Sequence, residues 1–397
     1  MVYAAYYVNL VVTAEPALEG HDQQAWLQRL AAEHDNIRTV LAWSCTTPTG
    51  TELGLRLAGA LAGFWWRRGF NHEARRWSER LLAQPGGSVA ARAKALLSLA
   101  DMVSVLDEYA LATRLFDESL ALFRELDDHA GIARTLLEQG RNLRLQGDYR
   151  RAMPLEEKSL ALFQTLQDRD GVMAALLSLG DVALDQGDLE RAQLRFGEAK
   201  ALSLELGNTD AVAWANVNLG CTAHARGDDV EARRLLEESL AQFREVDDRW
   251  GLAAVFQTLG DVARAQGEIA QAADLLRDCL TLAVELASPA SIADAFAGLV
   301  GVAATAGQAE RAARLCGQVA ALLAANDLAQ SPINCATYDR NVAVARAQLD
   351  EPNWAAAWEE GRAMSLEQAV AYTVCDEDVT LSRHQSPADG VGLDENV

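Results

Sequence analysis

Arginine side chains at helical spacing are the residues of this sequence best suited to holding a charged ligand. Arg134, Arg141 and Arg144 are separated by seven and three residues, so a helix over this segment carries all three on one face. Guanidinium groups bind carboxylates and phosphates through paired, charge-assisted hydrogen bonds. These arginines are therefore a candidate site for an anionic group of a ligand.

The same arginines also have acidic partners within the chain. Asp101 and Asp181 lie 40 residues before and after Arg141, and Glu138 precedes Arg141 by one helical turn. A ladder of alternating charges between neighbouring helices would neutralise itself without any ligand. Both interpretations stay open, and Arg144 is the arginine that these neighbours account for least.

A second group of candidates lies about 75 residues further along the chain. Trp214 offers a flat apolar surface of the kind that anchors binding partners, and the Asn218 amide can pair with the backbone of an extended peptide. The alternative is structural: Trp214 packs between repeats, and Asn218 bonds to its neighbour Thr258 or Ser178. The sequence supports these two interpretations about equally.

Residue patterns typical of catalysis or metal binding are missing from the sequence. It has no P-loop motif, no Gly-x-Ser-x-Gly elbow and no Cys-x-x-Cys pair. No histidine has another four residues away, and none joins cysteines at zinc spacing. We therefore expect no enzyme activity, no cofactor and no metal. The six histidines are His21, His34, His72, His129, His224 and His384.

The composition indicates a globular, acidic protein. Of 397 residues, 50% are hydrophobic and 23% are charged, and the net charge is −22. Such a charge repels phosphate backbones and anionic lipid, which argues against binding to nucleic acid or membranes. No apolar run reaches the roughly 18 residues that span a bilayer. The cysteines are interpreted as reduced thiols, and we expect a cytoplasmic protein.

Internal repeats decide the fold class. Glycines recur every 40 residues, each followed five residues later by an alanine, and in most units another glycine precedes by seven. Six units in constant phase occupy residues 89–328. Each unit predicts two helices joined by a glycine turn, and a single pair of this kind cannot bury its own apolar face. The recurring glycines are Gly147, Gly187, Gly227, Gly267 and Gly307.

The motif Leu179-Gly180, Gly187, Ala192, Phe196, Ala199 resembles the tetratricopeptide signature, with the long helices of MalT-type regulators. The resemblance implies an all-α, right-handed superhelical solenoid of antiparallel helix pairs. It also implies a concave groove lined by the first helix of each pair. The groove positions that we single out as candidate ligand contacts are Arg134, Arg141, Arg144, Asp181, Trp214, Asn218, His224, Gln257, Asp261 and Arg264.

The flanks extend the array at both ends. Residues 1–88 are predicted as an N-terminal helical cap, with one long helix over 22–44 and an atypical repeat formed by helices 55–69 and 71–82. Residues 329–374 are predicted as a divergent last pair and a capping helix that begins with a Ser365 to Gln368 capping box. Residues 375–397 are acidic and aperiodic, and are interpreted as disordered.

The flanks also resemble a second family. The segments 26–38 (WLQRLAAEHDNIR) and 356–367 (AAWEEGRAMSLE) are similar to sequences of bacterial signal-transducing ATPases, including LuxR-type regulators. The resemblance implies a non-enzymatic sensor arm whose groove binds a protein segment, a peptide or a small inducer. The alternatives are a self-assembling scaffold, hence a homo-oligomer, and an inducer-binding arm specific for small molecules.

Overall fold

The computed structural model describes residues 1–18, 22–326, 328 and 332–374. Within these ranges the chain forms α-helices and one short 3-10 helix, without any β-strand. The fold is therefore a helical solenoid, which confirms the all-helical class expected from the sequence. The segment predicted as a disordered tail, 375–397, lies outside the described residues. The N-terminal elements are α1 (Val2–Ala17), α2 (Gln23–Ala32), α3 (His34–Ser44), η1 (Pro48–Gly50), α4 (Thr51–Ala60), α5 (Ala62–Arg67) and α6 (Asn71–Leu82).

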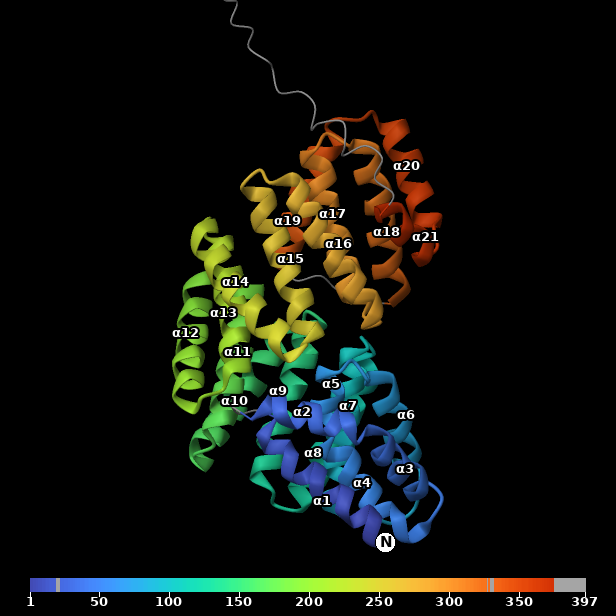
Figure 1. Cartoon of the computed structure of the whole chain (residues 1–397). Helices are drawn as coiled ribbons and strands as arrows, with labels where there is room; N and C mark the ends of the chain where they lie inside the picture. Colours follow the sequence, from blue (N-terminus) through green and yellow to red (C-terminus); the bar gives the residue numbers. More distant parts are fainter. Residues whose placement is uncertain (19–21, 327, 329–331, 375–397) are drawn as a thin grey trace, which may run out of the picture.

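Each 40-residue unit folds into two consecutive helices that pack against each other, and Figure 1 shows the units following one another along the molecule. A divergent pair and a short last helix complete the array. The repeat helices are α7 (Val89–Val105), α8 (Tyr109–Glu125), α9 (His129–Leu145), α10 (Tyr149–Leu166), α11 (Arg169–Asp185), α12 (Leu189–Leu206), α13 (Thr209–Ala225), α14 (Asp229–Val246), α15 (Arg249–Ala265), α16 (Ile269–Glu285), α17 (Pro289–Thr305) and α18 (Ala309–Asn326). The last helices are α19 (Pro332–Arg346), α20 (Glu351–Ala363) and α21 (Leu366–Val374).

The turn inside each unit follows the local chemistry of its residues. Gly187 has a φ of +77°, a left-handed conformation that side chains with a Cβ rarely adopt. Asp188 then caps α12, because its carboxylate accepts a hydrogen bond from the backbone N–H of Arg191. The equivalent glycines of four other units share the positive φ. Within a unit the two helices approach closely, since a Cβ at Gly180 would overlap the ring of Phe196.

The direction of curvature follows from which helices touch. Each first helix of a unit contacts the first helix of the next unit, from α7 through α17. No comparable contact joins consecutive second helices in the described part of the chain. The first helices are therefore closer together and lie on the inside of the curve. We call the inward surface of α7, α9, α11, α13, α15 and α17 the concave face.

The predicted long helix over 22–44 is wrong. It is divided at Glu33 into α2 and α3, where the backbone leaves helical geometry. The Glu33 carboxylate accepts hydrogen bonds from the Tyr7 hydroxyl, at 2.9 Å, and from the Asn36 amide, at 2.6 Å. After the break His34 stacks on Phe70 with ring centroids 4.6 Å apart. These contacts with other helices favour the break over a continuous helix.

The predicted helix over 55–69 is also divided, at Leu61, into α4 and α5. Phe64 and Trp65 follow the break and have no exposed surface, so these aromatic residues belong to the packing of the cap. Trp66 is only partly buried. The break thus directs two large rings into the N-terminal core and leaves a third at its edge.

The N-terminal helices are attached to the middle of the repeat array. The Gln24 amide donates to the carbonyl oxygen of Glu245 at 2.9 Å, and Arg67 forms an ion pair with Asp210 at 2.9 Å. In Figure 1 the helices α2 and α5 lie at the edge of the N-terminal bundle nearest the later repeats. The cap therefore contacts repeats that are far from it in sequence.

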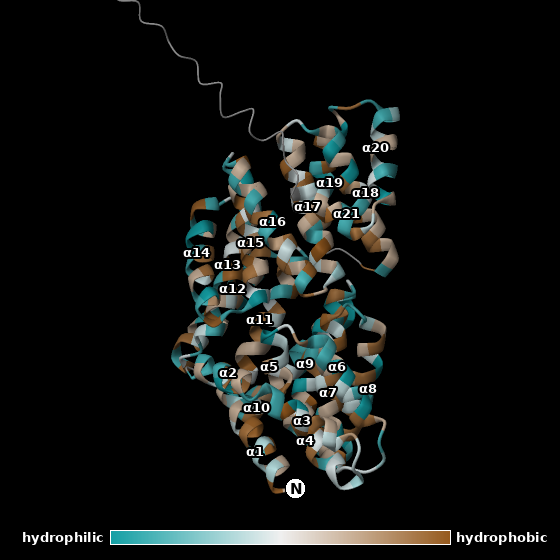
Figure 2. Cartoon of the chain, turned by 45° about the vertical axis from the view of Figure 1, so that its right-hand side comes forward, coloured by the Kyte–Doolittle hydropathy of each residue, from teal (hydrophilic) through white to brown (hydrophobic). Residues whose placement is uncertain are grey.

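Most helices are amphipathic, and Figure 2 shows hydrophilic and hydrophobic residues side by side along them. This is the pattern expected where each helix buries one side against its neighbours. Among the described helices, none is long and apolar enough to cross a membrane. The capping box predicted for the last helix is confirmed, since the backbone N–H of Ser365 donates to Gln368 and that of Gln368 donates to the Ser365 hydroxyl.

Candidate ligand-binding face

Arg144 is held by two carboxylates of the next repeat. Its guanidinium lies 2.8 Å from Asp185 and 3.7 Å from Asp181, both on α11. This corrects the expectation that Arg144 is the arginine its neighbours account for least. The physical reason is that the last turn of α9 packs beside the last turn of α11, where both aspartates lie. Burial raises the pKa of Asp181 to about 6, although Arg144 acts to lower it.

The other two arginines of α9 pair within their own helix. Glu138 lies 3.0 Å from Arg134 and 3.1 Å from Arg141, and Arg141 also donates to the carbonyl oxygen of Ala174. Arg141 forms no ion pair with Asp101 or Asp181, so the predicted ladder through Arg141 is wrong. Oppositely charged residues of neighbouring repeats do form an ion pair, but the arginine is Arg144 rather than Arg141. Burial and the nearby Glu138 raise the pKa of Asp101 well above its usual range.

Asn218 connects the fourth repeat to the third. Its side-chain amide donates to Asp181 at 2.9 Å, rather than to the predicted partners Thr258 or Ser178. Thr258 instead lies 3.3 Å from the Cys221 thiol. Asp181 therefore receives Arg144 from the repeat before it and Asn218 from the repeat after it. A continuous polar network crosses the concave faces of α9, α11 and α13.

Trp214 packs against two aromatic rings. Its ring centroid is 5.2 Å from that of Phe243 and 6.2 Å from that of Trp66 on α5. The indole N–H is buried and has no hydrogen-bond partner. These ring contacts are structural, but they join Trp214 to its own repeat and to the cap, rather than to a neighbouring repeat as the structural interpretation expects. Trp214 is therefore partly covered by the N-terminal helices in this conformation.

The fifth repeat places its candidate residues together. The Gln257 amide donates to Asp261 at 3.4 Å, and Arg264 lies 3.7 Å from the same carboxyl group. Burial raises the pKa of Asp261, while Arg264 and His224 lower it. His224 itself lies 2.6 Å from Asp229, at the start of α14. The ten predicted residues thus form local clusters along successive repeats rather than one compact site.

Three carboxylates that sequence reasoning left out of the candidate list belong to the same region. Asp185 pairs with Arg144, while Asp294 on α17 has Asp107, Asp185 and Asp261 as its charged neighbours. The repeat period could have signalled both, since Asp294 lies four periods after Arg134 and two after Trp214, and Asp185 follows by one residue the position equivalent to Arg144. The third is Glu156 on α10, which has no exposed surface and whose two carboxylate oxygens have no hydrogen-bond partner. Its position in the repeat signals it, because the equivalent residues include Phe116, Phe196, Leu236 and Leu276.

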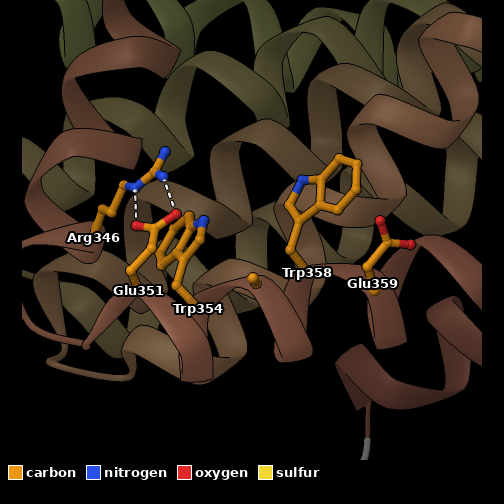
Figure 3. Close-up of a pocket in the computed structure, with 6 residues that line it drawn as sticks. Arg346, Glu351, Trp354, Trp358 and Glu359 are labelled. Carbon is orange, nitrogen blue, oxygen red and sulfur yellow. Dashed lines mark hydrogen bonds and ion pairs between the residues drawn. The ribbon is translucent and has the colours of Figure 1, made fainter.

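A separate pocket lies at the C-terminal end of the array, on α20 (Figure 3). It has a volume of about 260 Å³, and Trp354 and Trp358 line it one helical turn apart. Arg346 forms an ion pair with Glu351 at its edge and lies 5.8 Å from the centroid of Trp354. The charged groups there satisfy one another, and the pocket contains none of the predicted residues. Over the described ranges, no group of three or more His, Cys, Asp or Glu side chains could hold a metal ion.

The repeat helices match a known family model. The model described as tetratricopeptide repeat matches residues 91–165, 171–245 and 211–284, from the first turns of α7 to the end of α16. The repeats in this part of the chain are tetratricopeptide repeats. No curated protein is a significant match to this sequence.

Several solved structures are similar to this tetratricopeptide solenoid. A Rap protein complexed with competence and sporulation factor has a TM-score of 0.56 and 13% identity, covering 87% of this chain and 98% of its own. The Rap conjugation gene regulator of plasmid pLS20, in complex with the Phr* peptide, has a TM-score of 0.55 and 12% identity, covering 86% and 96%. A signal transduction ATPase with a tetratricopeptide repeat sensor from Pyrococcus horikoshii has a TM-score of 0.49 and 11% identity, covering 86% and 52%. At these identities the likeness is one of fold.

Proposed function

We propose that this protein is a non-enzymatic interaction module whose concave face binds an extended peptide or protein segment. The observation that carries the proposal is the polar network of Asn218, Asp181, Arg144 and Asp185, which crosses three successive repeats. An extended backbone presents a donor or acceptor at regular intervals, and amide and carboxylate side chains in a row can pair with them.

The likeness to the two Rap proteins supports this proposal. Both of those proteins are described in complex with a ligand, one of them a peptide, and both share the solenoid over most of this chain. A preformed helical array binds such a segment at low cost in reorganisation, because its concave face is already built by packed helices. The proposed ligand-binding surface is the concave face, on which the first helices of successive repeats contact one another.

We further propose that the module is the regulatory arm of a signal-transducing ATPase that controls transcription. The support is the resemblance of the segments 26–38 and 356–367 to that family. The first segment covers most of α2 and the start of α3, and the second covers the later part of α20 and the start of α21. In this role, ligand binding would act through the cap, which is bonded to both helices of the fourth repeat.

The experiment that tests peptide binding is selection from a random peptide library on the whole protein, followed by affinity measurement with variants. Asn218→Ala should weaken an enriched peptide by more than ~1 kcal/mol, because its amide lies on the concave face. The matched control is Gln164→Ala, which removes an exposed amide from the outer helix α10. The melting temperatures of both variants should stay within a few degrees of the parent.

Equal losses of affinity in both variants would contradict binding at the concave face. Native mass spectrometry of the protein from its source separates the other roles. A bound small molecule without peptide binding would favour an inducer sensor. A mass that rises with protein concentration would favour a self-assembling scaffold.

A further inference from the structure

The arginines of the concave face are already used by the protein's own acids. Arg134 and Arg141 pair with Glu138, Arg144 with Asp181 and Asp185, and Arg264 with Asp261. An incoming anion would have to displace a carboxylate from each of them, and it would meet the remaining carboxylates at close range. The concave face is therefore poorly suited to the anionic ligand that the arginines alone suggest.

Asp294 is a carboxylate of this face whose charged neighbours include no cation. It forms no hydrogen bond or ion pair with any residue in the described part of the chain. Its charged neighbours come from three other elements and are all acidic: Asp107 after α7, Asp185 on α11 and Asp261 on α15. Burial, with these like charges, raises the pKa of Asp294 to about 7. A cation placed here would relieve a repulsion that the free protein retains.

Glu156 is a second, independent indication that this region lacks a positive charge. It is fully buried, and a Cβ at Gly140 would lie 2.5 Å from its Cγ, so its side chain is pressed against α9 one turn before Arg144. Both of its oxygens lack partners, and so does the buried Nε of Arg144. Unpaired polar groups of this kind are rare because each one lowers the free energy of unfolding.

The groups around Glu156 explain how it is tolerated. Burial raises the pKa of Glu156 to about 7, while Ser178, Arg144 and Arg141 lower it and Asp181 raises it. The Ser178 hydroxyl lies near but makes no hydrogen bond in this conformation. Near neutral pH the carboxyl group is therefore protonated in about half of the molecules, and burying it then costs less than burying a charge. If Arg144 left Asp185, Glu156 is the carboxylate placed to receive it.

We propose that the concave face binds a cationic group of its ligand between Asp185 and Asp294, and that Arg144 then moves from Asp185 to Glu156. This inference rests on the proposed function and names the chemistry of its ligand. The ligand cation replaces Arg144 at Asp185 and supplies the partner that Asp294 lacks. Arg144 in turn gives Glu156 the cation that it lacks, and both Glu156 and Asp294 become fully ionised.

The first test compares three pools of blocked pentapeptides, with arginine, citrulline or glutamate at the centre and mixed residues elsewhere. Citrulline has the shape of arginine without its charge. The arginine pool should be retained at least tenfold better than the citrulline pool, and the glutamate pool should be retained least. Asp294→Asn should abolish this difference, whereas Asp274→Asn should preserve it. Asp274 is a matched control because it has the same charge and lies 77% exposed on α16.

The second test counts protons in the strongest complex by calorimetry at pH 7 in buffers of different ionisation enthalpy. With two groups whose pKa is about 7, binding should release about one proton per ligand. Glu156→Gln should reduce this release to about half while the protein remains folded. A release that Glu156→Gln does not change would overturn the exchange of Arg144.

The outcomes separate this inference from the proposed function. Equal retention of the arginine and citrulline pools, lost in Asn218→Ala, would leave peptide binding standing and would overturn the cationic site. Retention of no pool at all would contradict both. Asp294→Asn should melt at or above the temperature of the parent, because it removes an unpaired charge, so a loss of binding in this variant does not come from unfolding.

Discussion

Arg67 of α5 and Asp210 of α13 lie 143 residues apart in the chain and form an ion pair of 2.9 Å in which the two side chains are only 9% and 10% exposed. Arg67 Nη1 donates to the carbonyl oxygen of Gly63, whereas Arg67 Nε and Asp210 Oδ1 are buried without partners. Asp210 also acts on Asp248, whose pKa is raised to about 6 by burial and by this neighbouring charge. The pair thus attaches the N-terminal cap to the fourth repeat at a place where losing one partner leaves a buried charge.

Removing Arg67 should therefore be costly. Arg67→Ala should lower the free energy of unfolding by about 3–5 kcal/mol, since Asp210 is left uncompensated. The control is Arg68→Ala in the next position, because its partner Asp247 is 69% exposed and such pairs contribute about 0–1 kcal/mol. Urea denaturation of the two variants measures the difference. Equal losses would mean that the cap is held by other contacts.

The acid at position 156 should make stability depend on pH. The pKa of Glu156 is raised from 4.5 to about 7 in the folded protein, so the folded state holds its proton more tightly than the unfolded state. Stability is then highest below about pH 4.5 and falls as the pH rises through 7, by on the order of 3 kcal/mol for this group.

Glu156→Leu should remove that loss, because leucine is the residue that two other repeats carry at this position. Other buried carboxylates titrate in the same range, so the measurement is the difference between variant and parent in chemical unfolding at pH 5 and pH 8. The variant should gain more at pH 8 than at pH 5. The same gain at both values would show that Glu156 is not protonated near neutrality.

The glycine turn between α11 and α12 should tolerate some side chains and not others. Gly187 has a φ of +77° and open space around its Cα, so only backbone strain opposes a substitution. Gly187→Val should lower the free energy of unfolding by about 1–3 kcal/mol. Gly187→Asn should cost less, since asparagine enters the left-handed region more readily. Thermal unfolding ranks the two, and a valine variant as stable as the asparagine variant would contradict this explanation.

A contact between distant repeats should control the opening of the array. Asp107, which follows α7, accepts hydrogen bonds from the backbone N–H of Ala290, at 3.0 Å, and from the Ser288 hydroxyl, at 3.3 Å. Asp107 has a φ of +62°, so Asp107→Gly keeps the turn and removes the carboxylate, which also accepts a hydrogen bond from the Tyr109 hydroxyl. The amide of Ala290 should then exchange with solvent roughly tenfold faster. Unchanged exchange, with Asp107→Asn as the intermediate case, would show that the contact does not hold the array closed.

The features that the sequence predicts well are those encoded locally. The turn at Gly187 and the capping box at Ser365 each depend on residues within four positions, and both form as expected. The repeat period adds the stacking, because each apolar face has only its neighbours to pack against. Local chemistry repeated at a constant period is sufficient for the solenoid.

The features that the sequence does not predict depend on residues far apart in the chain. Nothing near Arg67 indicates that it pairs with Asp210, and the break at Glu33 requires Tyr7 from another helix. The partner of Arg144 was also missed, because comparison of equivalent positions pairs each residue with its counterpart. The real contact joins the position four residues after Gly140 to the positions one and five residues after Gly180 in the next repeat.

The central claim is that the concave face binds an extended peptide, and hydrogen exchange of the whole protein with and without a library-selected peptide tests it most directly. We predict slower exchange in α11 and α13, whose side chains carry the polar network, and little change in the outer helices α10 and α12. Protection confined to the outer helices, or to α20 beside the pocket of Figure 3, would contradict the account.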